Sequence, residues 1–442
     1  MKALRIPILL CLLTATLSLS AQVTDGVTAQ AFSEIREHPH LSANNYLAYP
    51  APRQTRLDPP PAGYEPIYVS HYGRHGSRYF IQPDDYLFAL QTLQRADSLR
   101  LLTPLGQQTL RQIRLMHAEA DRRLGELTPL GARQHREIAR RMFERFPEVF
   151  CDTAHIDARS TVVIRCILSM ENALQEFIRL NPRLRISHDA SQYDMPYMNQ
   201  QDTILFRQKM NPASERLFQA MQDSLCQPER LMQSLFSSRR YWKKNIDSQK
   251  LYTHLYHLAA VVQNSEIRHQ LSLYPLFTAD ELCRLWETEN LWWYLAYGPN
   301  PHNGGLQPYT QRNLLRNIIH EADSCLALGQ PCATLRFGHE TMVMPLACLL
   351  DLDGYGTPID RPADVARRGW VDYRIFPMAA NIQIVFFRQP DHPEAPTLVQ
   401  VLLNENPATL PLQPHEGHYY LWSDFRRHYL QKLDEFDRQH TH

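Results

Sequence analysis

Two arginines and two histidines are packed into one short, glycine-containing segment, residues 70–79, which reads SHYGRHGSRY. Arg74 and Arg78 would supply forked guanidinium donors for phosphate oxygens, and Gly76 would let backbone N–H groups approach the anion. An imidazole at His75, between the two arginines, could attack phosphorus and hold the phosphoryl group as a covalent intermediate. The segment therefore predicts phosphoryl chemistry with His75 as the nucleophile.

This segment lies between a predicted strand and predicted helices. Residues 66–70, PIYVS, are largely β-branched and aromatic, which predicts a strand. From residue 82 onward the pattern becomes helical, and Thr-Pro pairs at 103–104 and 128–129 are typical of helix starts. Because open α/β sheets bind ligands at the carboxyl ends of their strands, this position favours a binding loop.

The rest of the chain alternates strands with helices and is interrupted once. Further strands are expected at residues 154–158, 184–187, 332–337, 382–387 and 398–403, and helices at 160–180 and 421–439. This alternation predicts an α/β fold with a largely parallel central sheet flanked by helices. Residues 193–301 lack β-branched runs and predict an inserted, mostly α-helical cap between the core segments 22–192 and 302–442.

Composition and the amino terminus limit the functional classes. The 46 Lys and Arg residues balance 46 Asp and Glu residues, so the overall charge gives no attraction for nucleic acid. Residues 1–21 are typical of a signal peptide, because Lys2 and Arg5 precede an apolar run that ends in small residues. We expect an exported protein, in the periplasm, at the cell surface or outside the cell, and no later segment predicts a membrane span.

Without the signal peptide the chain keeps an odd set of cysteines and no C-x-x-C pair, so at least one lies outside any intramolecular disulfide. Cys325 and Cys332 would be the easiest local pair, but buried free thiols explain the set equally well. Disulfide pairing is left open. A zinc site is disfavoured, and the sequence predicts no metal and no cofactor.

Residues 74–80, which we call the catalytic segment, resemble the R-H-G-x-R-x-P signature of the histidine acid phosphatases. Phe80 stands where that family usually has proline. Residues 125–131, GELTPLG, resemble the family's G-x-L-T-x-x-G helix start. The segment Arg159-Ser160-Thr161 resembles the R-S-T segment that follows the second strand of the family. This resemblance implies that Arg159 is a third phosphate-binding arginine. Arg165, further along, is expected to support the site or to order the helix, with a phosphate contact left open.

The last matching segment is Gly338-His339-Glu340-Thr341, directly after the strand at 332–337, where the family has a His-Asp dipeptide. By resemblance His339 would donate to the phosphate, and Glu340 would protonate the leaving alkoxide and later activate water. Glutamate replaces the usual aspartate here, and the inositol polyphosphate phosphatase branch tends to have His-Ala-Glu. A helix-start carboxylate with a structural role is the alternative for Glu340.

Residues 377–381, PMAAN, and 401–405, VLLNE, look like the C-terminal part of the multiple inositol polyphosphate phosphatase branch, so the resemblance runs from about residue 66 to 411. It implies a secreted phosphomonoesterase that acts through a phosphohistidine on inositol polyphosphates such as phytate. The alternatives are a histidine acid phosphatase of broad specificity and a non-catalytic phosphate-binding homologue.

A basic cluster within the expected cap is a candidate for contacts with peripheral phosphates of the substrate. It comprises Arg239, Arg240, Lys243 and Lys244. A solvated helix face explains the same pattern equally well. The expected partner is a small phosphorylated molecule, and the oligomeric state is left open.

Overall fold

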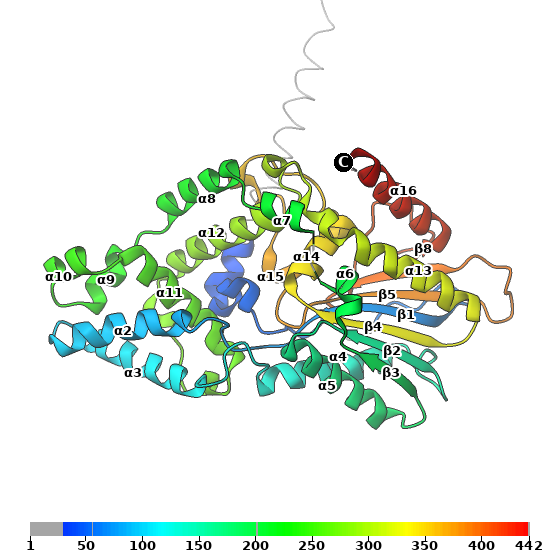
Figure 1. The fold of residues 1–442 in the computed structure, drawn as a ribbon, viewed down its shortest axis with the longest axis horizontal. Helices are drawn as coiled ribbons and strands as arrows, with labels where there is room; N and C mark the ends of the chain where they lie inside the picture. Colours follow the sequence, from blue (N-terminus) through cyan, green and yellow to red (C-terminus); the bar gives the residue numbers. More distant parts are fainter. Residues whose placement is uncertain (1–29, 55, 200–201, 441–442) are drawn as a thin grey trace, which may run out of the picture.

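A mixed β-sheet runs through the centre of one half of the molecule (Figure 1). The computed structural model describes residues 30–54, 56–199 and 202–440. The strands are β1 (Glu65–Arg74), β2 (His155–Ser160), β3 (Arg185–Asp189), β4 (Cys332–Gly338), β5 (Asn381–Arg388), β6 (Leu398–Leu403), β7 (Asn406–Pro407) and β8 (Tyr420–Leu421). Their order in the sheet is β3-β2-β4-β1-β5-β6-β7, and β8 pairs with β6.

The first four strands form a parallel core, and the C-terminal strands extend it in antiparallel fashion. β4 is buried at every residue, as a central strand covered on both faces must be. The predicted α/β fold with a central parallel core is confirmed. β1 and β4 are direct neighbours, with Arg74 opposite Gly338, so the segments that follow them emerge side by side.

Helices cover both faces of the sheet. On one face α4 (Pro129–Arg145) and α5 (Ile164–Leu180) pack on Val69, Leu335 and their neighbours. On the other face α13 (Arg312–Leu328), α14 (Glu340–Leu349) and α16 (Trp422–His440) pack with Tyr68, Ile384 and Val401. The two apolar clusters follow from alternation, because successive residues of a strand point to opposite faces.

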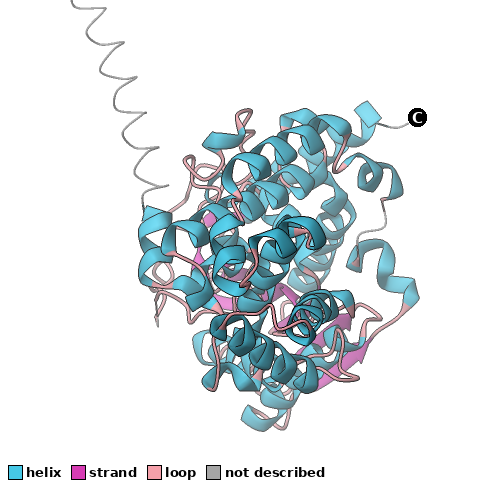
Figure 2. Cartoon of the chain, turned by 90° about the vertical axis from the view of Figure 1, so that its left-hand side faces the viewer, coloured by secondary structure: helices cyan, strands magenta, loops and turns pink. Residues whose placement is uncertain are grey.

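The second half of the molecule is helical and lies beside the sheet (Figures 1 and 2). Its helices are α2 (Asp84–Ser98), α3 (Pro104–Glu119), α8 (Pro212–Leu225), α9 (Glu229–Leu235), α10 (Arg239–Asn245), α11 (Ser248–Val261) and α12 (Ala279–Tyr297), with short helices α6 (Met195–Met198), α7 (Thr203–Gln208) and α15 (Asp372–Ile375) closer to the sheet. One apolar cluster joins α2 and α3 to α9, α11 and α12. Helices from residues 84–119 thus share a core with helices from residues 193–301, so the helical half also includes residues outside the predicted cap.

The amino-terminal part of the described chain belongs to this helical half. A 3-10 helix, η1 (Pro39–Tyr46), packs against α11, α12 and α15. Residues 1–21, with the expected signal peptide, lie outside the described residues. Within the described residues no helix is long and apolar enough to span a membrane.

Candidate active site

Backbone hydrogen bonds tie the catalytic segment at the end of β1 to the end of β4 and to the residue before β5. The His75 N–H donates to the Gly338 carbonyl oxygen at 2.9 Å, and the Arg74 N–H donates to the Ala380 carbonyl oxygen at 2.7 Å. Position 75 therefore stands beside the start of α14, which carries Glu340. Residues far apart in sequence meet here because their strands are adjacent and parallel.

The glycines of the two matching motifs pack backbone to backbone. A Cβ atom on Gly76 would lie 2.5 Å from the carbonyl oxygen of Gly131, so a side chain there would displace the loop. Thr128 caps α4, since its hydroxyl accepts from the Gly131 N–H at 3.2 Å and donates to the Ser77 carbonyl oxygen at 3.1 Å. The GELTPLG segment thus holds the catalytic loop against the start of α4.

His75 is completely buried, and its tautomer is set by the backbone. Nδ1 lies 2.9 Å from the Gly76 carbonyl oxygen, and because a carbonyl can only accept, Nδ1 must carry the hydrogen. Burial lowers the pKa of His75 well below its ordinary value, although the neighbouring Glu340 carboxylate acts in the opposite direction. The free imidazole is therefore neutral, with a nucleophilic lone pair on Nε2.

Glu340 places a carboxylate oxygen 3.6 Å from Nε2 of His75 and 3.1 Å from Nε of Arg74. Burial acts to raise its pKa, but the Arg74 guanidinium and then the neighbouring His75 hold the pKa of Glu340 well below its usual range. The carboxylate is thus ionised before substrate binds. A bound phosphate dianion would oppose these cations and raise the pKa of Glu340 toward the protonated form.

Around His75 several buried nitrogen atoms have no hydrogen-bond partner in the described structure. They are Nη2 of Arg74, Nε2 of His75, Nε of Arg78 and Nε of Arg165. Nη1 of Arg74, in contrast, is anchored by the carbonyl oxygens of Asn45 and Phe376 at 2.7 and 2.9 Å. A buried hydrogen-bond donor without a partner costs free energy. A cluster of buried cationic donors is therefore suited to bind an anion with several acceptor oxygens.

His339 forms another wall of the site. Its ring lies 5.8 Å from that of His75, edge to face, and its Nε2 lies 3.3 Å from the hydroxyl of Thr161. Burial lowers the pKa of His339 to about 4. A neutral His339 can donate one hydrogen bond toward the anion without adding charge.

The arginine that the structure brings to His75 is Arg165, whereas Arg159 was expected. The positive charge of Arg165 contributes to the lowered pKa values of His75 and Arg74, and burial and Arg78 lower the pKa of Arg165 itself. Arg159 instead pairs with Asp157 at 3.0 Å. The reason is position, because Arg159 still lies within β2 and points from the sheet face, while Arg165 stands in the first turn of α5, beyond the strand end.

The basic cluster Arg239, Arg240, Lys243 and Lys244 belongs to α10, at the tip of the helical half farthest from the sheet (Figure 1). Its helix is anchored by Trp242, which is buried in the helical core. None of the interactions described for these four side chains involves a residue of the His75 cluster.

The segment that sequence reasoning missed is η1. Tyr46 lies against Arg78, with the guanidinium carbon 5.5 Å from the ring centroid, and its hydroxyl hydrogen-bonds with Arg78. Its ring also packs edge to face on Phe80 at 5.3 Å, the residue that replaces the usual proline. No motif marks residues 39–46 in the sequence, so only the tertiary structure reveals that they line the site.

His75, His339 and Glu340 are also the donors that could hold a metal ion, since one ligand atom of each lies within 4.8 Å of the others. The surrounding charge opposes this use. Arg74, Arg78 and Arg165 place three guanidinium groups around the same space, so a cation would be repelled while an anion would be attracted.

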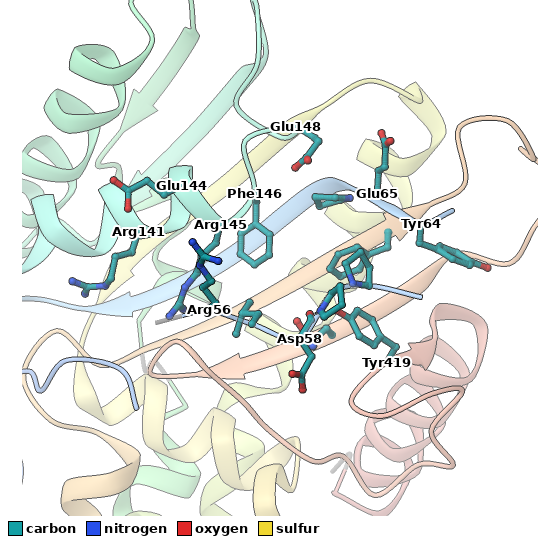
Figure 3. Close-up of a pocket in the computed structure, with 16 residues that line it drawn as sticks. Arg56, Asp58, Tyr64, Glu65, Arg141, Glu144, Arg145, Phe146, Glu148 and Tyr419 are labelled. Atoms are coloured by element: carbon teal, nitrogen blue, oxygen red, sulfur yellow. The ribbon is translucent and has the colours of Figure 1, made fainter. Parts of the chain in front are cut away.

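A cavity of about 570 Å³ lies at the opposite end of the sheet (Figure 3). It is lined by residues at the start of β1, including Tyr64 and Glu65, and by Arg145 at the end of α4. With ten residues in β1 and a rise of about 3.3 Å each, its start lies roughly 30 Å from His75. Acidic and basic side chains alternate around it, unlike the cationic cluster at His75.

Comparison with known proteins agrees with this geometry. Residues 74–404 match the sequence profile described as histidine phosphatase superfamily, branch 2. No curated protein matches the chain. Two solved structures of Bifidobacterium longum multiple inositol polyphosphate phosphatase are similar: the complex with inositol hexasulfate (18% identity, 87% of this chain and 96% of that chain, TM-score 0.73) and the complex with phosphate (17%, 89% and 98%, 0.74). The phytase of D. castellii is similar at 15% identity over 89% of this chain and 84% of that one, with a TM-score of 0.63.

Proposed function

Because the chain belongs to branch 2 of the histidine phosphatase superfamily, we propose that it hydrolyses phosphomonoesters through a phosphohistidine formed on Nε2 of His75. The observation that carries this proposal is the set of buried, unpartnered nitrogen atoms around a neutral imidazole. A phosphate group offers acceptor oxygens to the guanidinium groups and an electrophilic phosphorus to Nε2.

The reaction has two steps. His75 attacks phosphorus in line while Arg74, Arg78, Arg165 and His339 stabilise the phosphoryl oxygens. Glu340, protonated once the dianion is bound, gives its proton to the leaving alkoxide. Water then attacks the phosphohistidine, and Glu340 takes the proton of that water by microscopic reversibility. A non-catalytic phosphate-binding protein would need the arginines but not a neutral, correctly oriented His75.

For the substrate we propose inositol polyphosphates such as phytate, handled by an exported enzyme. This rests on the C-terminal motifs and on the fold shared with the multiple inositol polyphosphate phosphatase of B. longum. A broad-specificity phosphatase is the second candidate, favoured by the remote position of the α10 lysines and arginines, which leaves peripheral phosphates without that contact.

The test is phosphate release from phytate set against p-nitrophenyl phosphate, together with trapping of the phosphoenzyme. We expect both substrates to be hydrolysed, with phytate preferred in kcat/KM, and an acid-labile phosphohistidine in a rapid quench. His75→Ala should lose turnover on both while keeping phosphate affinity. More than a few per cent residual activity in that variant would remove His75 as the nucleophile, and equal kcat/KM values would favour broad specificity.

A further inference from the structure

Among the cysteines in the described residues, Cys325 and Cys332 contact each other. Cys325 lies near the end of α13 (Arg312–Leu328), and Cys332 is the first residue of β4. The chain reverses between them at Gly329, which has a φ of 64° and ends the helix in the left-handed conformation. Both are thiols in the structure, Cys325 packs against the apolar cluster that contains Cys332, and the two side chains interact with each other.

The surroundings fix the position of the Cys325 sulfur over the start of β4. Cys332 and Thr334 lie on the same face of this strand, two residues apart, and Cys325 interacts with both. Tyr68, the cross-strand neighbour of Cys332 on β1, also contacts Cys325, and its hydroxyl donates to Oγ1 of Thr334 at 2.9 Å. Thr334 and Tyr68 thus both contact the Cys325 thiol beside Cys332.

The other described cysteines have partners of a different kind. Their thiols contact carbonyl oxygens, a hydroxyl, an imidazole or a thioether: Cys151 with Glu148, Cys166 with Gly338 and His339, Cys226 with Thr288, Cys283 with Phe32 and Cys348 with Met344. The pairing of two thiols is therefore specific to Cys325 and Cys332.

We propose that Cys325 and Cys332 are a disulfide site, which closes when the folded protein meets a disulfide oxidant such as oxidised glutathione. The Cys325 thiolate attacks the oxidant, forms a mixed disulfide and expels one glutathione thiolate. Cys332 then loses its proton and attacks the Cys325 sulfur, which expels the second glutathione. The two protein thiols are oxidised by two electrons, and one glutathione disulfide is reduced to two thiols.

The asymmetry of the pair suits this order of events. Cys325 is partly exposed, whereas Cys332 is buried. The interaction with Cys332 lowers the pKa of Cys325, and the same interaction, with burial, raises the pKa of Cys332. The accessible sulfur is thus the one that ionises more easily, and the thiolate is the form that attacks a disulfide.

The disulfide would join α13 to the amino end of β4 and so stabilise the folded protein against unfolding. β4 has seven residues at about 3.3 Å each, so the disulfide would lie roughly 20 Å from His339. We therefore expect turnover to be the same in the thiol and disulfide forms. A loop this short gives a stabilisation of a few °C in Tm, about 2–5 °C.

The experiment treats the folded, full-length mature protein with oxidised glutathione, then denatures and alkylates it. We expect a peptide pair containing Cys325 and Cys332 that is lighter by about 2 Da and escapes alkylation, and a higher Tm that dithiothreitol reverses. Cys325→Ser should abolish both effects, and Cys151→Ser, which changes an exposed thiol outside the pair, should keep both.

Full alkylation of Cys325 and Cys332 after oxidation, or a bond from either one to another cysteine, would overturn the proposal. The mass measurement on the native protein does not depend on how any variant folds. It also does not depend on the phosphatase assay, so failure of the proposed function and failure of the disulfide are separate outcomes.

Discussion

Nε2 of His75 and a carboxylate oxygen of Glu340 face each other at 3.6 Å. A neutral imidazole with hydrogen on Nδ1 presents a lone pair from Nε2, and an ionised carboxylate presents another. The two atoms repel unless a proton or an electrophile lies between them. A phosphoryl group can lie between these two atoms. Nε2 of His75 can attack its phosphorus, and the oxygen of its leaving group can take a proton from the carboxyl group of Glu340.

Glu340→Gln tests the proton donor. We expect turnover of inositol phosphates to fall by about 10²–10⁴-fold, because an alkoxide leaves poorly without a proton, and turnover of p-nitrophenyl phosphate to fall much less. Steady-state kinetics on both substrates measure this difference. Glu37→Gln, at a side chain that is 74% exposed, is the control. Equal losses on the two substrates would demote Glu340 to an orienting residue.

Arg165→Ala and Arg159→Ala distinguish the two candidate arginines. Arg165 acts on His75 and Arg74, so its loss should lower kcat/KM for p-nitrophenyl phosphate by about 10²–10³-fold. Arg159 is paired with Asp157, so its loss should change kcat/KM by less than about threefold. The opposite ranking would restore Arg159 as the phosphate ligand.

Removal of metal ions with a chelator tests whether the site requires a metal ion bound by His75, His339 and Glu340. The three guanidinium groups around His75, His339 and Glu340 should keep divalent cations out, so dialysis against EDTA should leave kcat unchanged. Assays before and after dialysis, with zinc or magnesium added back, are the measurement. Activity that is lost in EDTA and returns with a metal would contradict the phosphohistidine mechanism.

The sequence predicted the residues of this site that occur in compact motifs at strand ends, namely Arg74, His75 and Arg78 after β1 and His339 and Glu340 after β4. It favoured Arg159 over Arg165 as the third phosphate-binding arginine, whereas the structure brings Arg165 to His75. That choice depends on where β2 ends and α5 begins, a boundary of a few residues that periodicity locates poorly. Tyr46 could not be predicted at all, because its role depends on a fold-back of η1 onto the catalytic loop.

At the scale of elements, a buried carboxyl group joins the helical half to the short helix that supports Arg74. Oδ1 of Asp372, in α15, accepts from Nε1 of Trp286 on α12 at 2.9 Å, while its Oδ2 is buried without a partner. Burial raises the pKa of Asp372 to about 7, with the nearby charge of Glu289 adding to the effect. Phe376, at the end of the same helix, accepts from Nη1 of Arg74.

Asp372→Asn tests this group by its effect on the pH dependence of stability. Since the folded-state pKa lies above the unfolded value of about 3.9, the native protein should lose stability as pH rises from about 4 through 7, by up to about 4 kcal/mol. The variant keeps an acceptor for Trp286 but cannot ionise. Its Tm relative to the native protein should therefore increase between pH 5 and pH 8.5.

Thermal unfolding of both proteins across this range is the measurement. Asp121→Asn, at a side chain that is 68% exposed, should follow the native curve. If the native and Asp372→Asn curves remained parallel, Asp372 would titrate like an ordinary surface carboxyl group.

The strands β4, β5 and β6 were predicted within a few residues because each is a largely apolar run, as central strands buried on both faces must be. β7 and β8 have two residues each and carry no pattern of their own. The helices that α2 and α3 pack against could also not be predicted from the sequence. The sequence pattern of an amphipathic helix shows that one face is buried, but it does not show which core that face packs against.

At the scale of the whole molecule, the site lies at the junction of the sheet half and the helical half, each with its own apolar core. The sheet half supplies the catalytic segment and α14, while the helical half supplies η1, so both must be complete before Arg74 and Arg78 are held. The parallel neighbours β1 and β4 are far apart in the chain, and contacts of this kind form slowly because of their loop-closure entropy.

Refolding from denaturant should therefore occur in at least two phases. Helical circular dichroism should recover first, since the hydrogen bonds within a helix are local in sequence, and phosphatase activity should return later, when β4 inserts beside β1. Parallel traces of ellipticity and activity measure this lag. Simultaneous recovery of the two signals would mean that the cores form as one cooperative unit.

The central position of β4 also has a consequence during synthesis on the ribosome. Ser70 of β1 and Arg336 of β4 hydrogen-bond across 266 positions of sequence, a length that takes roughly 13–50 s to translate. For that interval a nascent chain carries β1 with an unpaired, apolar edge, which is a template for pairing with other chains. Protection of this edge by a chaperone, rather than the stability of the finished protein, would then limit the yield of soluble enzyme.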